Sequence, residues 1–261
     1  MSDPIGVAVS VRAEARKAPA GDRWFMVGVT GLVIVLTAIG FLPSLVAPTS
    51  RTVPLPLTWL VMAHAVIAAA FLLVFLVQTV LVATRRTAVH RRLGVLGLLL
   101  AVMFTVIGAF SAVAETRRGF DLSGDLVARG TSHEPAIVLA PVIAVLMFAV
   151  LVGAAAIYRR RPQIHKRLMM LALVGTLAPA GVAHIVGHWS ALQPHALPIS
   201  IAGNFCLLCL SPAYERWTRG RVHPVSLWGG VGIFVFLNIF FGLVVPSASW
   251  HALADWVAGR G

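Results

Sequence analysis

The sequence is poor in charge and in cysteine. Only 11% of its residues are Asp, Glu, Lys or Arg, against about 25% in soluble domains. Two cysteines, Cys206 and Cys209, are too few for a disulfide framework. So little charge can neither solvate the surface of a soluble enzyme nor keep a chain disordered. These shortages exclude a soluble enzyme, a disordered protein and a disulfide scaffold.

Apolar residues take the place of the missing charge. They make up 59% of the chain, and the mean hydropathy is +0.90. In hydrocarbon, a backbone segment must satisfy its own polar groups, which favours helices of about 20 residues. We therefore expect an all-α integral membrane bundle of about seven transmembrane helices. The seven apolar runs cover residues 24–42, 57–82, 93–114, 135–157, 168–188, 197–210 and 226–245.

Three local expectations accompany these runs. The sixth run lies between Pro198 and Pro212, so it is expected to be short or tilted. Pro141 and Pro179 are expected to kink their helices. Close helix contacts are expected at small residues, namely Gly28, Gly31, Gly229, Gly230 and Gly232.

The basic residues predict an orientation. The net charge is +12, and 16 of the 21 lysines and arginines lie in the N-terminal tail and in every second loop. The positive-inside rule then places the N-terminus in the cytoplasm and the chain in the cytoplasmic (inner) membrane. Residues 1–23 form a cytoplasmic tail, 24–245 the transmembrane domain, and 246–261 an outer tail with a short interfacial helix. The basic excess predicts contact with anionic phospholipid rather than with nucleic acid.

An internal repeat marks the cytoplasmic starts of three helices. Residues 85–94 align without a gap with residues 160–169, and residues 219–225 form a weaker third copy, which indicates helix hairpins of one design. Each copy carries a histidine among basic residues. These side chains set topology, bind an anionic headgroup or haem propionate, or ligate a metal. The candidates are His90, Arg91, Arg92, His165, Lys166, Arg167 and His223.

A second group of histidines falls near the predicted outer face. His184 and His188 are four residues apart, so both project from one helical face, and His64 lies at a similar depth in another span. Ionisable residues within a membrane usually serve a function. We expect these three histidines to bind haem b or a transition metal.

Nearby carboxylates complete that prediction. Glu115, Glu134 and His133 are further candidate metal ligands, and a mixed shell of histidine and carboxylate suits iron, zinc or manganese. Two facing histidines without a carboxylate suit a b-type haem. The alternative for Glu134 is an ordinary helix-start signal before Pro135. No catalytic residue can be named.

The repeated motifs carry a resemblance. HRRLG at residues 90–94 and HKRLM at 165–169 resemble a broad group of uncharacterised bacterial multi-pass membrane proteins, in which H-R-x-L-G and H-R-R-L-M open two helices. The resemblance covers roughly residues 57–245 and implies no particular activity. The chain is more distantly similar to cytochrome b561-type and haem-handling membrane proteins, which implies haem near helix ends. It departs from them because its cytoplasmic histidines lie at helix starts and no facing inner histidine is present, which argues against a path through two haems.

Three functional hypotheses follow from the sequence. The first is a redox or cofactor-handling membrane protein that uses the outer histidines. The second is a transporter or lipid-interacting protein whose basic loops hold anionic headgroups. The third is a non-catalytic accessory subunit that packs against another membrane protein or forms a homo-oligomer.

Overall fold

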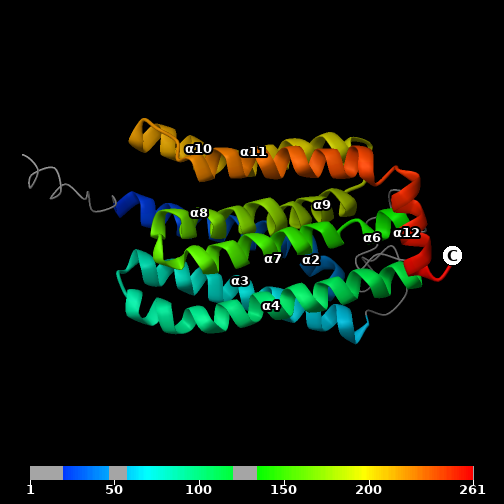
Figure 1. Cartoon of the computed structure of the whole chain (residues 1–261), viewed down its shortest axis with the longest axis horizontal. Helices are drawn as coiled ribbons and strands as arrows, with labels where there is room; N and C mark the ends of the chain where they lie inside the picture. The colour runs from blue at the N-terminus through cyan, green and yellow to red at the C-terminus, as the bar shows by residue number, and fades with distance from the viewer. Residues whose placement is uncertain (1–19, 47–57, 120–133, 261) are drawn as a thin grey trace, which may run out of the picture.

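The computed structural model describes residues 20–46, 58–119 and 134–260, so the candidate ligand His133 lies outside the described residues. The described residues contain helices and turns but no strand. Seven helical stretches are long and apolar enough to cross a membrane, and they run roughly parallel to the long axis of the molecule (Figure 1). The expected all-α multi-pass architecture is confirmed. These stretches are Gly21–Pro43, Trp59–Ala83, Thr87–Arg118, Pro135–Arg160, Pro162–His188, Gln193–Arg219 and Pro224–Val244.

The helix boundaries follow local sequence signals. Thr58 accepts a hydrogen bond from the Val61 amide and starts the second span, whereas Gly119 and Gly220 end spans in the left-handed conformation. The helices are α2 (Ala20–Val46), α3 (Trp59–Ala83), α4 (Thr87–Arg118), α6 (Pro135–Leu139), α7 (Val142–Ile157), α8 (Pro162–Ala172), α9 (Ala178–His188), α10 (Ala196–Arg219), α11 (Pro224–Ile239) and α12 (Ala248–Ala258).

The sixth span is longer than expected. Helix α10 has 24 residues and passes through Pro212, so the predicted end at residue 210 is wrong. Proline costs a helix one backbone hydrogen bond. The polar turn that follows stays helical because Glu215 and Arg219 form ion pairs with other helices.

The fifth span is the centre of the bundle. In the most apolar 18-residue stretch of this span, 56% of residues are buried inside the protein, compared with 17 to 33% in the same stretch of the other six spans. A π-helical turn, Leu173–Leu177, separates α8 from α9 just before Pro179. Pro179 has no amide hydrogen to donate, and the Thr176 hydroxyl donates to the Ala172 carbonyl at 2.5 Å. Helical order is also broken at Pro141, between α6 and α7, so both expected proline positions coincide with interruptions.

Helices α2 and α9 make the closest backbone approach. A Cβ atom on Gly40 would lie 2.6 Å from the Gly181 carbonyl oxygen, so only glycine fits there. Three of the glycines that were expected at close helix contacts do not lie at such contacts. A Cβ atom built on Gly28, Gly31 or Gly232 would meet no described atom of a neighbouring helix within 4 Å, so the expectation is wrong for these three. Small size alone does not reveal which helix face packs.

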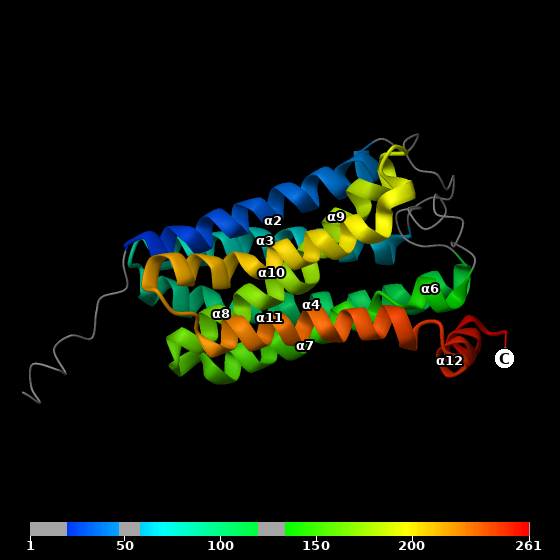
Figure 2. The ribbon, with the colours of Figure 1, turned by 90° about the horizontal axis from the view of Figure 1, so that it is seen from above.

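A C-terminal helix lies across the end of the bundle at which α4 ends and α6 begins. Helix α12 lies across α6 and the end of α4 (Figures 1 and 2). The Trp250 indole donates to the Ala136 carbonyl at 2.8 Å, and the Arg117 side chain donates to the Val257 carbonyl at 3.1 Å. The helix expected in the C-terminal tail is therefore present and attached by polar contacts.

Candidate functional site

One end of the bundle gathers charged side chains from four helices. Helices α2, α8 and α11 begin there and α10 ends there. We call this region the charged end. It contains Asp22 of α2, Lys166 and Arg167 of α8, Glu215 and Arg219 of α10, and His223 and Ser226 at the start of α11.

A buried ion pair joins α8 to α10. Arg167 Nη2 lies 2.6 Å from Glu215 Oε1, and the two residues are only 4% and 5% exposed. Glu215 also accepts hydrogen bonds from the His223 amide at 2.9 Å and the Ser226 hydroxyl at 3.2 Å. Arg167 Nη1 donates to the backbone carbonyl and side-chain oxygen of Gln163. Each charge of the pair thus has several partners, as a buried ion pair requires.

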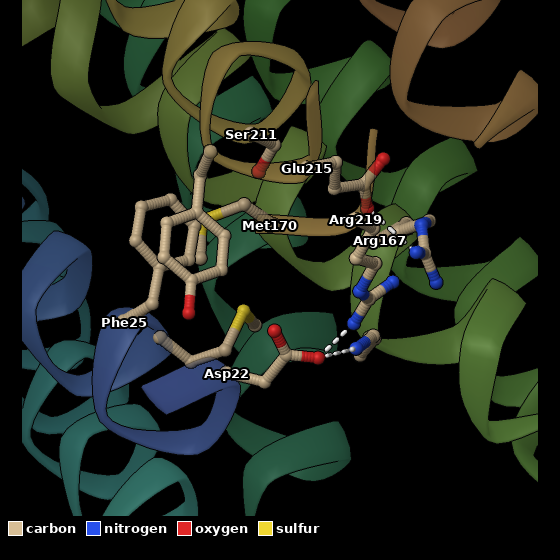
Figure 3. Close-up of a pocket in the computed structure, with 10 residues that line it drawn as sticks. Asp22, Phe25, Arg167, Met170, Ser211, Glu215 and Arg219 are labelled. Carbon is tan, nitrogen blue, oxygen red and sulfur yellow. Dashed lines mark hydrogen bonds and ion pairs between the residues drawn. The ribbon is translucent and has the colours of Figure 1, made fainter. Parts of the chain in front are cut away.

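A second ion pair joins α2 to the same region. Oxygen Oδ2 of Asp22 pairs with Arg219 and lies 3.6 Å from Lys166 Nζ. The other oxygen, Oδ1, is buried without a hydrogen-bond partner among the described residues and points toward the middle of the surrounding side chains (Figure 3). One carboxylate thus faces two cations, so this group carries one excess positive charge.

These residues surround a small pocket between α2, α8 and α10 (Figure 3). Its volume is about 20 Å³, enough for one water-sized group. One wall is charged and the other is apolar, with Phe25 and Tyr214 stacked at a centroid distance of 4.0 Å. The lining residues are Asp22, Phe25, Met26, Lys166, Arg167, Met170, Ser211, Tyr214, Glu215 and Arg219.

The sequence indicated only part of this site. Lys166, Arg167 and His223 were candidates, but Asp22 and Glu215 were not. One feature of the sequence could have indicated them. Asp22 and Glu215 are the only described acidic residues at an end whose loops are otherwise basic. The burial of Arg167 against Glu215 also separates it from its exposed neighbours in the repeat motif.

Exposed arginines surround the charged end. Because Asp22 and Glu215 are buried and paired, the described surface of this end exposes basic but no acidic side chains. We call the exposed arginines the basic rim. It consists of Arg85, Arg86, Arg91, Arg92, Arg159, Arg160, Arg161, Arg216 and Arg221. Trp217, beside the rim, is 85% exposed.

The repeat brings two of its three histidines together. The rings of His90 and His165 meet edge to face with centroids 6.5 Å apart. Atom Nδ1 of His165 hydrogen-bonds the Ala155 carbonyl at 2.8 Å, whereas Nδ1 of His90 is buried and has no described partner.

His223 has a separate role at the start of α11. Its Nδ1 accepts the Val225 amide hydrogen at 3.2 Å, so the neutral ring caps the helix. Burial, followed by the positive charge of Arg167, lowers the pKa of His223 below its usual value. The Glu215 carboxylate opposes this shift, while Lys166 and Arg219 add to it.

The predicted outer histidines lie at two different helix interfaces. His64 of α3 stacks on Phe104 of α4 with ring centroids 4.8 Å apart, and its ring covers Gly108. His184 of α9 instead stacks on Phe41 of α2, with centroids 3.8 Å apart.

The i, i+4 histidine pair also forms bonds within its own helix. Nδ1 of His184 hydrogen-bonds the Ala180 carbonyl at 2.8 Å, and Nδ1 of His188 the His184 carbonyl at 2.7 Å. A bond at Nδ1 leaves Nε2 as the atom that faces other groups. We call this region, with His64, His184, His188 and Glu115, the histidine end.

The two predicted carboxylate ligands have ordinary local roles. Glu115 is buried and pairs with Arg118 of the same helix at 2.9 Å. Glu134 is exposed at the N-terminus of α6 and its side chain makes no capping bond. Within residues 20–46, 58–119 and 134–260, no three or more His, Cys, Asp or Glu side chains are placed to hold a metal ion. Metal binding and haem binding by these candidates both stay predictions.

Comparison with family models, curated proteins and solved structures finds no match to this chain. Its function is therefore inferred from its own side chains.

Proposed function

We propose that the protein is a lipid-interacting multi-pass membrane protein that binds anionic phospholipid headgroups at its charged end. The observation that supports this proposal is the basic rim. Nine exposed arginines surround this end, while its two described acids are buried in ion pairs.

The chemistry of the rim suits phosphate groups. Guanidinium groups bind phosphate with two parallel hydrogen bonds, which an ammonium cannot do. Near an anionic membrane surface each basic residue contributes about 1 kcal/mol of attraction. The exposed indole of Trp217 is suited to the headgroup level of a bilayer.

The proposal is tested by the response of thermal stability to lipid. The protein in a neutral detergent is mixed with phosphatidylglycerol or with phosphatidylcholine, and the unfolding temperature is measured. We expect a larger rise with the anionic lipid, and a smaller difference at high salt because exposed charges are screened. Equal rises with the two lipids would contradict the proposal.

Matched variants locate the effect. The triple variant Arg91→Gln, Arg92→Gln and Arg160→Gln removes exposed charge from the basic rim. The control variant, Arg117→Gln with Arg260→Gln, removes exposed charge from the opposite end. We expect the rim variant to lose most of the preference for anionic lipid and the control to keep it. Equal losses in both variants would show that binding is not specific to the charged end.

A further inference from the structure

Two buried polar atoms of the charged end lack partners. Asp22 Oδ1, an acceptor, and Arg167 Nε, a donor, have no hydrogen-bond partner among the described residues, although both residues are at least 95% buried. Such unsatisfied groups cost free energy and call for a ligand or water. Both residues line the pocket between α2, α8 and α10, and Asp22 Oδ1 points into it (Figure 3).

The charged side chains at the pocket opening suit the binding of a phosphodiester. The side chains of Lys166 and Arg219 are 28% and 24% exposed, so they reach the surface while they pair with Oδ2 of Asp22. Their ammonium and guanidinium groups have more donors than Asp22 uses. The single excess positive charge of this group matches the single negative charge of a phosphodiester.

The interior of the pocket selects among headgroups by size and by hydrogen bonding. A volume of about 20 Å³ fits a hydroxyl group but not a trimethylammonium group. A hydroxyl can donate to Asp22 Oδ1, and its oxygen can accept from a donor such as Arg167 Nε.

We propose that this pocket is a headgroup subsite for phosphatidylglycerol, an anionic phospholipid whose phosphodiester bears free hydroxyl groups. Lys166 and Arg219 bind the phosphate, Asp22 Oδ1 accepts a headgroup hydroxyl, and the acyl chains extend past Phe25 and Met26 into the bilayer. The subsite rests on the proposed lipid-binding function and adds selectivity to it.

The test compares two lipids of equal charge. Short-chain phosphatidylglycerol and phosphatidylethanol are both monoanionic phosphodiesters, but only the first has headgroup hydroxyls. Their dissociation constants for the full-length protein are measured by native mass spectrometry, with phosphatidylcholine as the uncharged reference. One hydrogen bond to a charged group predicts about tenfold tighter binding of phosphatidylglycerol. Equal binding of the two anionic lipids would overturn the subsite but leave the proposed function intact, whereas binding no tighter than phosphatidylcholine would overturn both.

Two variants test which side chain binds the headgroup hydroxyl and which binds the phosphate. In Asp22→Asn, the amide oxygen must face Lys166 and Arg219, so the NH₂ group faces the pocket and a donor replaces the acceptor. We expect the tenfold preference to vanish. Lys166→Gln, at a partly exposed side chain, should weaken the binding of both anionic lipids about equally. The control Asp255→Asn, at the opposite end, should change neither constant.

Three results would overturn the assignment. A preference retained in Asp22→Asn would show that another group reads the hydroxyl. If that variant does not fold, unchanged lipid binding by Lys166→Gln would be sufficient to reject the site. Soluble glycerol 3-phosphate that competes as well as the lipid would show that the pocket binds a free phosphate ester.

Discussion

The two ends of the bundle hold their polar side chains in different ways. At the charged end, ion pairs connect separate helices, as Asp22 of α2 does with Arg219 of α10. At the histidine end, the ion pair of Glu115 with Arg118 and the bond of His188 to the His184 carbonyl stay within one helix. The described hydrogen bonds of Arg117 and Trp250 do join helices there, but they end on backbone carbonyls and not on charged side chains. Bonds between helices fix their relative positions, whereas bonds within a helix do not. We infer that electrostatics orders the charged end and close packing the histidine end.

This difference bears on function. A network that connects α2, α8, α10 and α11 holds its side chains in a fixed geometry, which a selective binding site needs. The charged end has such a network, a pocket and unsatisfied buried atoms. At the histidine end, His64 and His184 are separated between two interfaces.

The largest effect is expected when one partner of the buried ion pair is removed. Arg167→Met leaves the Glu215 carboxylate buried without its cation, which costs about 3 to 5 kcal/mol. The double variant Arg167→Met with Glu215→Leu should recover much of this loss, because no unpaired charge remains. Chemical denaturation in detergent measures both. Arg118→Gln, at the histidine end, should cost less than Arg167→Met, because Arg118 is partly exposed and water can take its place beside the Glu115 carboxylate; an equal loss there would remove the contrast between the ends.

A smaller but clear effect is expected from packing at the histidine end. Gly40→Leu forces a side chain against the Gly181 backbone and the Cβ atom of His184. Overpacking of this kind costs about 1 to 3 kcal/mol. Gly28→Leu, on the same helix at a position where an added Cβ atom would meet no described atom within 4 Å, is the matched control and should cost little. Similar unfolding temperatures for the two variants would argue against packing as the main contact between α2 and α9.

The charged end should also respond to pH through His223. Its pKa is lowered in the folded protein, so below the ordinary value of 6.5 the unfolded chain binds a proton that the folded chain resists. Stability should therefore fall as the pH drops through 6.5 toward the lower folded pKa, and level off below it. His223→Asn keeps a capping acceptor and should flatten this part of the stability profile between pH 7 and 5. An unchanged profile would show that His223 does not contribute.

The smallest effect is expected at His64. Its Nδ1 is buried without a described partner, so His64→Leu removes an unsatisfied polar atom together with a ring contact to Phe104. These opposing effects should keep the change in unfolding free energy within about 1 kcal/mol. Loss of a haem absorbance band from the purified protein in this variant would contradict our view of the histidine end and support the cofactor hypothesis.

Sequence patterns predicted the spans better than the contacts. Hydropathy identified seven spans because lipid exposure requires long apolar runs. It gave the wrong end for the sixth span, because the turn after Pro212 is stabilised by ion pairs with other helices. The repeat correctly indicated related helix starts, and His90 and His165 do lie together.

The site could be predicted only in part. The position of a residue along its helix does not determine which neighbouring helix its side chain faces. His64 and His184 were matched by their distance along two helices, but each faces a different neighbour. Arg167 and Arg92 occupy equivalent positions in the repeat, yet one is buried and the other exposed. Arg167 is buried in an ion pair with Glu215, which is distant in the sequence from both repeat motifs.

Photo-crosslinking to phosphatidylglycerol locates the bound headgroup on the protein. A lipid analogue with a photoreactive group next to its headgroup is bound to the protein in a bilayer and activated, and the labelled peptides are mapped by mass spectrometry. We expect labels at the start of α2, the start of α8 and the last turns of α10, around the pocket that contains Asp22. Labels concentrated on α12 and α6, or spread evenly over both ends of the bundle, would contradict a headgroup site at the charged end.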